Sequence, residues 1–354
     1  SSPEQYFELV NQLRTNNGAT SLDFRKKMSQ LAFTETAYYD SVITNYFNKI
    51  SNIHFPKKKI THGNLIEKLR YGENPHQQSA IYSQTKDIKL NKIHGKTLSY
   101  NNYNDIFSAL TISKSLPKNV GTVIVKHANP CGVSIIKNNL DSYKSALACD
   151  PISAFGGIVS CNFKITKTLA IEFNKIFLEV IVANGFDKNA LKILKLKKNL
   201  RLIDASNFSF DEMLKHNSIN DSILVQSEDK ELFSKKNFKV VSKKKPSKSQ
   251  FEDLMFAFNV CRYVKSNAIV IASNKSTVGI GSGQSSRLDS CEIAIDKMRK
   301  FTNSENEIVA ASDAFFPFVD GIEKLIQSGV SAVIQPSGSI RDKEIIKFAD
   351  ATNT

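Results

Sequence analysis

Short apolar runs that alternate with helical segments constrain the fold of this chain most strongly. Four of these runs have the length and β-branched character of buried strands: residues 122–125, 157–160, 268–272 and 332–334. Helical patterns lie between or beside them, at residues 105–115, 165–177, 247–264 and 321–328. This alternation predicts a layered α/β architecture. Each run ends in a small polar or glycine-containing stretch, which is where ligands gather in α/β sheets.

The first fifty residues are predicted to form two helices. Ser2 followed by Pro3 is typical of a helix start, and Asn17-Gly18 is typical of a helix end. Residues 20–23 resemble a capping box for a second, longer helix that runs towards Phe47. One face of the first helix is apolar: it carries Tyr6, Leu9, Val10 and Leu13. A basic linker containing proline follows at residues 56–59.

Composition limits the class of protein. A chain of 354 residues that is 41% hydrophobic can bury a large core, and it is expected to hold more than one structural unit. No apolar run reaches the roughly 20 residues that cross a bilayer, and the N-terminus has no signal-peptide pattern. The five cysteines form no Cys-x-x-Cys pair. We therefore expect a reduced, cytoplasmic setting and no membrane partner.

The net charge of +14 leaves two interpretations open. A basic chain can bind nucleic acid by neutralising phosphates. However, the lysine runs at residues 57–59, 192–198 and 235–248 contain no nucleic-acid module signature and no interleaved aromatic residues suited to base stacking. We favour a solvated, lysine-rich surface whose field steers anionic substrates, and we expect no nucleic-acid partner.

A lysine and a histidine follow the first predicted strand directly. The segment Val123-Ile-Val-Lys-His-Ala-Asn-Pro-Cys-Gly132 places Lys126 and His127 at the strand end, with a Pro/Gly turn expected beyond them. Histidine is the usual general base near neutral pH, and an adjacent lysine can stabilise developing negative charge. The alternative is a pair that only fixes the strand end. Zinc is not expected, because Asn129 stands where deaminases have a catalytic Glu and no second cysteine follows Cys131 at the required spacing.

Three further segments are candidates for ligand binding. Lys68-Leu-Arg-Tyr-Gly-Glu-Asn-Pro-His76 offers Arg70 for bidentate capture of a phosphate or carboxylate, although an ordinary surface turn is the alternative. Gly279-Ile-Gly-Ser-Gly-Gln-Ser-Ser-Arg287 could let a ligand approach the backbone, although it lacks the full dinucleotide fingerprint and a tight turn is equally consistent. Ala311-Ser-Asp-Ala-Phe-Phe-Pro-Phe-Val-Asp320 offers an apolar wall with polar anchors, and one of its phenylalanines is expected to be core.

Taken together, these segments resemble the AICAR transformylase family. Six motifs occur in that family's order across residues 68–342: Lys-Leu-Arg-Tyr-Gly-x-Asn-Pro-His-Gln, Val-Lys-His-x-Asn-Pro-Cys-Gly, Asp-Pro-x-Ser-Ala-Phe-Gly-Gly, Lys-Ser-Asn-Ala, Gly-x-Gly-x-Gly-Gln-x-Ser-Arg and Ser-Asp-Ala-Phe-Phe-Pro-Phe-x-Asp. The resemblance implies a tandem of cytidine-deaminase-like α/β/α units without zinc, assembled as an intertwined homodimer with active sites near the interface. It also implies three parts: helices left from a cyclohydrolase domain at residues 1–55, then transformylase subdomains at residues 56–235 and 236–354.

The resemblance further implies substrates and roles. The substrates would be AICAR and the cosubstrate 10-formyltetrahydrofolate; a structural monovalent cation is left open. His127 matches the family's proton acceptor, Lys126 the group that stabilises the transition state, and Asn267 the residue that holds the carboxamide. The expected nucleotide contacts are Arg70, Tyr71, Gly156, Glu179 and Phe315. The expected folate contacts are Asn102, Arg287, Leu288, Pro317, Phe318, Asp320, Ser339 and Ile340, with Asp320 on the pterin ring.

The sequence departs from the family's pattern at both ends. It stops at Thr354, before the family's arginine-containing tail, and it begins after the sheet that carries cyclohydrolase chemistry. We therefore expect formyl transfer rather than cyclohydrolase activity from these residues. Two other hypotheses compete with it. A deaminase-like hydrolase would need metal ligands that the sequence lacks, and a nucleic-acid-binding protein is supported only by the net charge.

Overall fold

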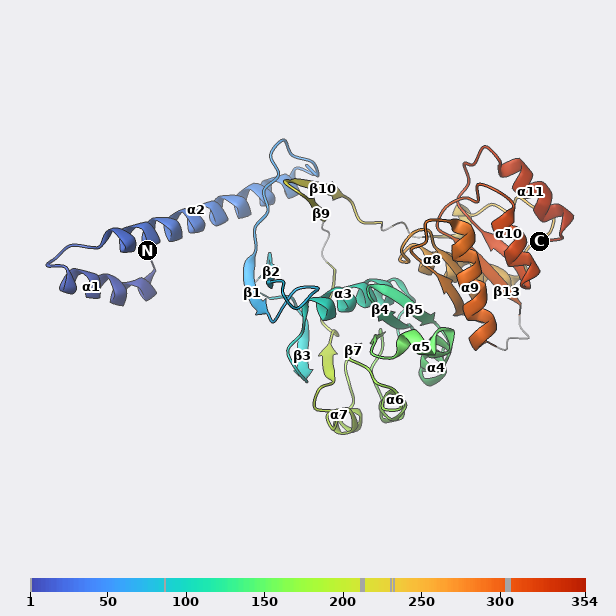
Figure 1. Cartoon of the computed structure of the whole chain (residues 1–354), viewed down its shortest axis with the longest axis horizontal. Coiled ribbons are helices and arrows are strands. Elements are labelled where there is room, and N and C mark those ends of the chain that lie inside the picture. The colour runs from blue at the N-terminus through green and yellow to red at the C-terminus, as the bar shows by residue number, and fades with distance from the viewer. Residues whose placement is uncertain (1, 86, 211–213, 230, 232, 303–306) are drawn as a thin grey trace. The chain divides into compact units, whose positions relative to one another are not determined.

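The computed structural model describes residues 2–85, 87–210, 214–229, 231, 233–302 and 307–354. Its contacts separate two compact units, which are described one at a time. Unit 1 is drawn from residues 1–67, 81–88 and 212–228, and unit 2 from residues 68–80, 89–211 and 229–354. Alternating helices and strands make up most of unit 2 (Figure 1).

The helices that the structure describes are η1 (Pro3–Gln5), α1 (Tyr6–Thr15), α2 (Leu22–Ile50), α3 (Tyr100–Ser115), α4 (Asn139–Cys149), α5 (Pro151–Ala154), α6 (Lys167–Phe173), α7 (Lys188–Leu194), η2 (Lys235–Asn237), α8 (Lys248–Cys261), α9 (Arg287–Phe301), α10 (Asp320–Gln327) and α11 (Asp342–Ala351). The described strands are β1 (Asn64–Leu69), β2 (Ser79–Ser83), β3 (Asn91–His94), β4 (Thr122–Lys126), β5 (Asn129–Ser134), β6 (Ile158–Cys161), β7 (Val180–Ala183), β8 (Arg201–Asp204), β9 (Lys215–Ile219), β10 (Ser222–Gln226), β11 (Ile269–Ser273), β12 (Ser276–Gly281), β13 (Ile308–Ser312) and β14 (Val330–Ile334).

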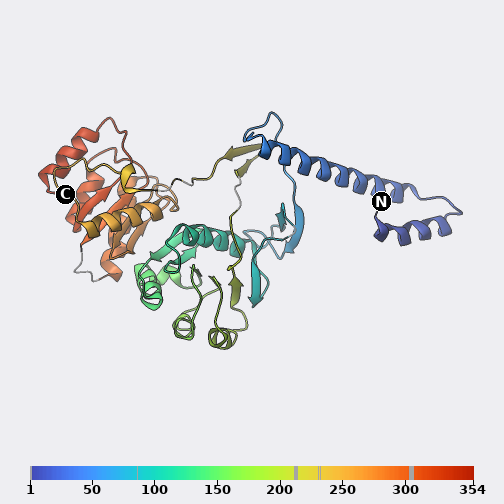
Figure 2. The same ribbon diagram turned by 180° about the vertical axis from the view of Figure 1, so that it is seen from behind.

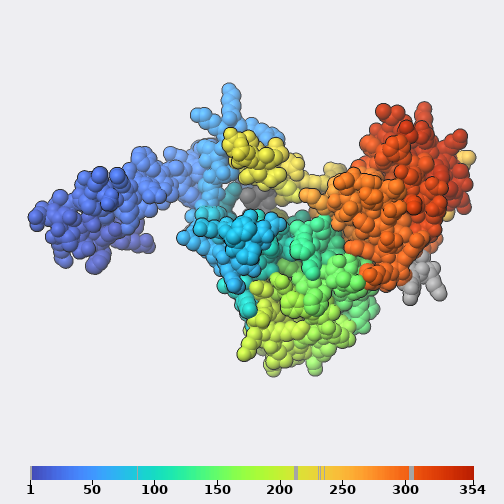
Figure 3. Space-filling model, in the orientation of Figure 1, coloured from blue at the N-terminus to red at the C-terminus, as the bar shows by residue number. Residues whose placement is uncertain are grey.

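The two helices predicted for the first fifty residues are confirmed in unit 1. The hydroxyl of Ser21 accepts a hydrogen bond from the backbone N–H of Phe24 and so caps α2. Gly18 adopts φ +85° where α1 ends. An ion pair of 2.8 Å between Lys27 and Glu8 ties α2 to α1. The residues of α1 and of the first part of α2 form one dark-blue lobe in the space-filling view (Figure 3). The predicted apolar face of α1 is not covered, since no side chain of that helix is buried.

Within the described residues of unit 2, ten strands form one mixed sheet in the order β14-β13-β11-β12-β5-β4-β6-β7-β8-β3. The four predicted strands correspond to β4, β6, β11 and β14, and their predicted flanking helices correspond to α3, α6, α8 and α10. The layered α/β prediction is therefore confirmed. Neighbouring β6, β7 and β8 run parallel, whereas β4 pairs antiparallel with both β5 and β6.

Helices cover both faces of this sheet, because alternate residues of its strands point to opposite sides. Ile124 packs with residues of α4, α6 and α7 in one core cluster, whereas α3 contacts β4 and β6 but contributes no side chain to that cluster. In the other half, Ile269 and Ile271 pack with α9, α10 and α11, and α8 contacts the same strands without joining that cluster. Figures 1 and 2 both show α6 and α7 next to each other along this sheet.

The sheet contains an internal repeat. The order β5-β4-β6-β7 in the first repeat (residues 100–204) reappears as β12-β11-β13-β14 in the second repeat (residues 248–334). In each repeat a hairpin is followed by an antiparallel neighbour and then by a parallel one. The two repeats meet where β12 pairs antiparallel with β5, with Ser276 opposite Ser134.

Matching hydrogen bonds support this repeat. After β6, Asn162 accepts the backbone N–H of Gly121 at 2.8 Å; after β13, Asp313 accepts that of Ala268 at 3.1 Å. Ser142 of α4 donates to the carbonyl of Val120 at 3.1 Å. Ser290 of α9 donates in the same way to the carbonyl of Asn267 at 2.8 Å. Each bond ties one of the two residues before the first hairpin strand to a later element, so the repeat extends to side-chain detail.

Glycines in the hairpins serve helix packing. A Cβ at Gly279 or Gly281 would collide with a backbone carbonyl of α9, either that of Ala294 or that of Ser290. The expectation that these glycines let a ligand approach the backbone is therefore wrong for both positions, because a helix occupies that space. Gly132 in the first repeat plays the equivalent part, since its Cβ would collide with the carbonyl of Ala146 in α4.

Replacing Gly132 with alanine should destabilise the protein by about 1–3 kcal/mol or more, because the backbone of β5 or that of α4 must move to make room for the new methyl group. Urea unfolding measures the change in the free energy of unfolding. Gly185→Ala serves as a control at a site with ordinary space, where only the left-handed φ of +96° opposes the methyl group. Equal stability of the Gly132 variant and the wild type would contradict this packing.

Candidate functional site

Lys126 is held at the carboxyl end of β4. Its ammonium group donates a 2.7 Å hydrogen bond to the carbonyl of Phe155, at the turn that leads into β6. The next residue, Gly156, adopts φ +74°, and a Cβ there would lie 3.9 Å from Lys126 Nζ. The structure therefore places two predicted site residues, Lys126 and Gly156, in the same corner. The carbonyl of Phe155 fixes the position of the ammonium group, and because the lysine is only half-buried, part of its side chain remains accessible to solvent.

His127 and Ala128 form the tight turn between β4 and β5. Their φ angles are +52° and +58°, which is the left-handed pair that two-residue hairpins require. The carboxylate of Asp105, on α3, accepts the N–H of His127 at 3.3 Å and that of Ala128 at 2.7 Å. The His127 side chain itself is exposed. The turn thus presents an imidazole to solvent on a fixed backbone.

The expected Pro/Gly turn beyond His127 is wrong. Residues 129–134 form β5, and Pro130 pairs with Val125 at an irregularity in the ladder. The chain has already reversed at His127 and Ala128, where Asp105 satisfies both N–H groups. Proline has no backbone N–H to donate to the sheet. It can occupy this strand position because the ladder is already interrupted there by the bulge.

Asn267 lies just before β11 and is fixed by three polar contacts. Its amide group donates to the carbonyls of Gln284 and Ser285 at 3.0 and 3.1 Å, and its oxygen accepts from Arg287 at 2.8 Å. Arg287 also donates to Ser312 and pairs with Asp313. Two predicted residues, Asn267 and Arg287, are therefore direct partners.

The Lys126–His127 corner and the Asn267 segment meet. The side-chain oxygen of Asn129 accepts the backbone N–H of Lys265 at 3.1 Å, and its amide donates to the carbonyl of His127 at 3.1 Å. A single asparagine thus links the histidine turn to the residue two positions before Asn267. We define this region, built on Lys126, His127, Asn267 and their linking Asn129, as the seam site.

Asp313 is a polar centre of the seam site, whereas from the sequence it was only one polar anchor of the phenylalanine segment, with no individual role. It accepts hydrogen bonds from Ser266, the Arg287 guanidinium and the backbone of Ala268. Burial, the largest single influence, raises its pKa, but these donors outweigh burial and hold the pKa of Asp313 below its ordinary value. Its position directly after the buried strand β13 was the available signal, since polar groups at strand ends form ligand sites.

Two predicted residues of the first repeat interact with each other. Asn102 is buried, and its amide donates to Glu179 at 2.8 Å while its oxygen accepts the N–H of Ser99. Glu179 also lies 3.7 Å from Arg201. The amide of Asn102 therefore caps α3 and holds Glu179, whereas Glu179 keeps a partly exposed carboxylate.

Arg70 and Tyr71 follow β1, and the structure places them together. The Arg70 guanidinium is exposed and lies 5.6 Å from the centre of the Tyr71 ring. Among the described residues no carboxylate pairs with Arg70, so the donors of its guanidinium are available to an anion.

The phenylalanine segment divides as expected. Phe316 is 1% exposed and belongs to the core of the second repeat, whereas Phe315 is 39% and Phe318 50% exposed. The Arg341 guanidinium stacks 4.7 Å from the Phe318 ring centre. The remaining predicted folate contacts in the C-terminal part of the chain lie in surface loops or helix starts: Leu288, Pro317, Asp320, Ser339 and Ile340.

Cysteine and metal chemistry find little support in the described part of the chain. Burial raises the pKa of Cys131 to about 12, so its thiol stays protonated near neutral pH. Residues 2–302 and 307–354, apart from the few left undescribed, contain no group of three or more His, Cys, Asp or Glu side chains arranged to hold a metal ion. Their helices also include none long and apolar enough to span a bilayer.

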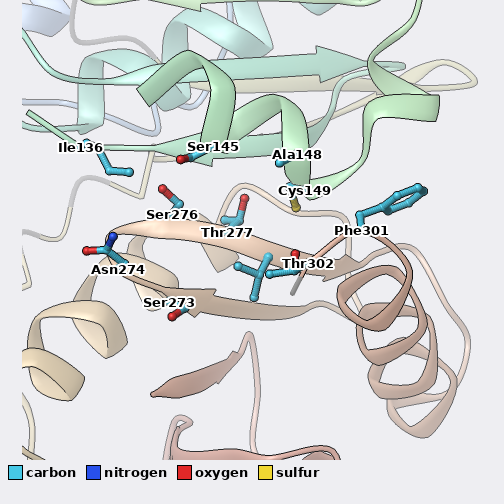
Figure 4. Close-up of a pocket in the computed structure, with 11 residues that line it drawn as sticks. Ile136, Ser145, Ala148, Cys149, Ser273, Asn274, Ser276, Thr277, Phe301 and Thr302 are labelled. Carbon is cyan, nitrogen blue, oxygen red and sulfur yellow. The ribbon is translucent and has the colours of Figure 1, made fainter. Parts of the chain in front are cut away.

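A pocket of about 260 Å³ lies away from the predicted residues, between β12 and α4 (Figure 4). It is lined by Ile136, Ser145, Ala148, Cys149, Ser273, Asn274, Ser276, Thr277, Val278, Phe301 and Thr302. The hydroxyls of Ser273 and Ser276 are already bonded to Glu307 and Ser134. None of the described residues that line the pocket is charged, so we place the chemistry at the seam site instead.

The fold and the seam site together define a class: a two-repeat α/β protein whose strand ends carry a lysine, a histidine and an anchored asparagine. Comparison with known proteins narrows the class. A family model described as the AICARFT/IMPCHase bienzyme matches residues 1–297. The chain is 43% identical over 352 residues to the bifunctional purine biosynthesis protein PurH of Leptospira biflexa. The matched residues make up 98% of this chain and 68% of that protein.

PurH proteins of two other organisms match in a similar way. PurH of Persephonella marina is 43% identical, and the match covers 98% of this chain and 69% of that protein. PurH of Aquifex aeolicus is 42% identical, and the match covers 99% of this chain and 69% of that protein. The chain belongs to the AICARFT/IMPCHase bienzyme family, a family of bifunctional purine-biosynthesis enzymes. The resemblance inferred from six motifs is thereby confirmed.

Proposed function

We propose that this chain transfers a formyl group from 10-formyltetrahydrofolate to the 5-amino group of AICAR. The observation that carries the proposal is the hydrogen-bonded link through Asn129, which joins the Lys126–His127 corner to the Asn267 segment. A general base, a cation and a carboxamide-binding side chain are the groups that formyl transfer to a weakly nucleophilic amine requires.

In the proposed mechanism, the AICAR amine attacks the formyl carbon and His127 accepts the proton that the amine loses. The new C–N bond places negative charge on the formyl oxygen, and Lys126 stabilises that charge. The bond between the formyl carbon and folate N10 then breaks, and N10 takes up a proton. Asn267 holds the substrate carboxamide beside the amine, so that orientation lowers the barrier.

The substrate contacts complete the proposal. Arg70 and Tyr71 would bind the ribonucleotide phosphate, and Gly156, Glu179 and Phe315 would contact the rest of AICAR. The folate would lie on Arg287, Leu288, Pro317, Phe318, Asp320, Ser339 and Ile340. Asn102 is assigned a supporting part, because its amide already bonds Glu179 and its oxygen caps α3.

We also propose the finer architecture. Each repeat would be a cytidine-deaminase-like unit without zinc; the support is the shared strand order with helices on both faces. Residues 1–55 would be helices of a cyclohydrolase domain, followed by subdomains at residues 56–235 and 236–354. The homodimer rests on the family resemblance, and analytical ultracentrifugation tests it.

A spectroscopic assay tests the proposed reaction. The protein is mixed with AICAR and 10-formyltetrahydrofolate, and the appearance of tetrahydrofolate is followed. We expect turnover that requires both substrates. Release of tetrahydrofolate at the same rate without AICAR would indicate hydrolysis of the cosubstrate and would contradict formyl transfer.

Replacing Arg70 with alanine should raise the KM for AICAR about tenfold or more while changing kcat little, since an exposed phosphate contact binds ground state and transition state alike. Lys68→Ala is the matched control, because it removes an exposed cation two residues away. An effect confined to kcat, or equal effects in both variants, would contradict a specific phosphate contact at Arg70.

A further inference from the structure

A half-buried carboxylate outside the proposed reacting groups, that of Asp105, holds the backbone of the histidine turn. We propose that Asp105 is a positioning residue for formyl transfer, one that fixes where Lys126 and His127 project. This inference rests on the proposed function, which supplies the reaction, but its structural part can be tested without any turnover.

The geometry of Asp105 is that of a turn clamp. One carboxylate oxygen accepts the N–H of His127 at 3.3 Å and the other accepts that of Ala128 at 2.7 Å. On the same helix, Ser108 donates to the carbonyl of Ala128 at 2.9 Å. Helix α3 therefore hydrogen-bonds both the N–H groups and a carbonyl group of the turn.

The clamp is needed because the turn is unfavourable for its residues. His127 and Ala128 both adopt positive φ, and no glycine is present to relieve the strain. Since these bonds go to the main chain, Asp105 does not share the imidazole proton. It acts by holding the backbone from which the imidazole and the preceding Lys126 extend.

The charge of Asp105 suits this role better than a neutral side chain would. Two N–H groups converge on the carboxylate, and each finds an oxygen that only accepts. An asparagine in the same place would turn its NH₂ group towards one of the two donors. Partial burial raises the pKa of the Asp105 carboxyl, and the hydrogen bonds from the turn oppose that shift only in part.

The second repeat contains the same clamp without the reactive side chains. Asp253 of α8 accepts the N–H groups of Asn274 and Lys275, both at 2.8 Å, and these residues also adopt positive φ. The strand before that turn ends in Ser273 where the first repeat has Lys126. The clamp is thus a property of the fold, and only the first copy carries a lysine and a histidine.

This pair gives a matched experiment with Asp105→Asn and Asp253→Asn. Both variants should lose similar stability in urea unfolding, because each sets an NH₂ group against one of two backbone N–H donors in the same kind of turn. Asp105→Asn should lower kcat for formyl transfer by about 100-fold, since small misplacements of catalytic groups have effects of this size. Its KM for AICAR should change by less than about threefold, and kcat of Asp253→Asn should change equally little.

Crystal structures of the two variants provide the readout that needs no activity. In Asp105→Asn we expect His127 and Ala128 to leave the left-handed region, with Lys126 displaced from the carbonyl of Phe155. An unchanged turn, equal kcat values in the two variants, or a loss confined to KM would each overturn the positioning role. An inactive wild type would reject the proposed reaction instead, and the variant structure would still decide whether Asp105 holds the turn.

Discussion

Replacing His127 with asparagine is expected to lower kcat for formyl transfer by about 10²- to 10⁴-fold, the usual contribution of a general base. The side chain is exposed, so its loss should leave the free energy of unfolding nearly unchanged. Asparagine is chosen because it tolerates positive φ, and Asn274 occupies the equivalent turn position of the second repeat at φ +47°. Alanine would add a backbone penalty unrelated to proton transfer.

His216→Asn is the control, since it removes another imidazole, on the exposed strand β9. It should retain wild-type kcat and KM. Near-normal turnover of the His127 variant, with folding verified by circular dichroism, would remove the imidazole from the mechanism. A large loss of stability in that variant would instead indicate a structural role for the ring.

Replacing Lys126 with methionine is expected to lower kcat by about 10²- to 10³-fold, which is the effect of removing one group that stabilises an oxyanion. Methionine keeps the length of the stem but removes the charge and the hydrogen bond to Phe155. The KM for AICAR should change little, because the charge that the lysine meets develops only in the transition state.

Lys118→Met is the matched control, because this exposed lysine precedes the same strand at its other end. Comparing the two variants separates a local effect from the general loss of one positive charge. Equal kcat values would show that Lys126 contributes only to the overall field of the protein.

Much of the fold could be predicted from the sequence, because buried strands and helices leave strong local patterns. The β-branched run at residues 122–125 and the capped helix starting near Ser247 needed no distant partner to be recognised. Strand β5 was missed because Pro130 and Gly132 look like a turn, whereas the reversal depends on Asp105, more than twenty residues earlier in the chain.

The candidate site was predictable where side-chain type is decisive, as for Lys126 and His127. It was not predictable where a third residue determines what a side chain does. Asn102 appears available in the sequence, yet its amide is bound to Glu179. Gly279 and Gly281 resemble a ligand loop, yet α9 fills the space beside them. Asp313 was predicted only as a polar anchor of its own segment, because its partners, Ser266 and Arg287, come from two other segments.

The family resemblance implied a tandem of two units, but only the structure shows which residues correspond between the two repeats. Ser142 and Ser290 make the same bond, but Asn162 in one copy corresponds to Asp313 in the other. Within this scaffold only the first turn carries the lysine and histidine, and only the second copy carries the anchored Asn267. The proposed site therefore needs both repeats.

Transfer of an isotopic label tests the central claim most directly. The protein is incubated with AICAR and 10-formyltetrahydrofolate labelled with ¹³C in the formyl group, and the nucleotide product is analysed by mass spectrometry. We predict that the wild type moves the labelled carbon to AICAR and that His127→Asn does so at least about 100-fold more slowly. Labelled formate with no labelled nucleotide, or equal rates in the two proteins, would contradict a formyl-transfer site at the seam between the repeats.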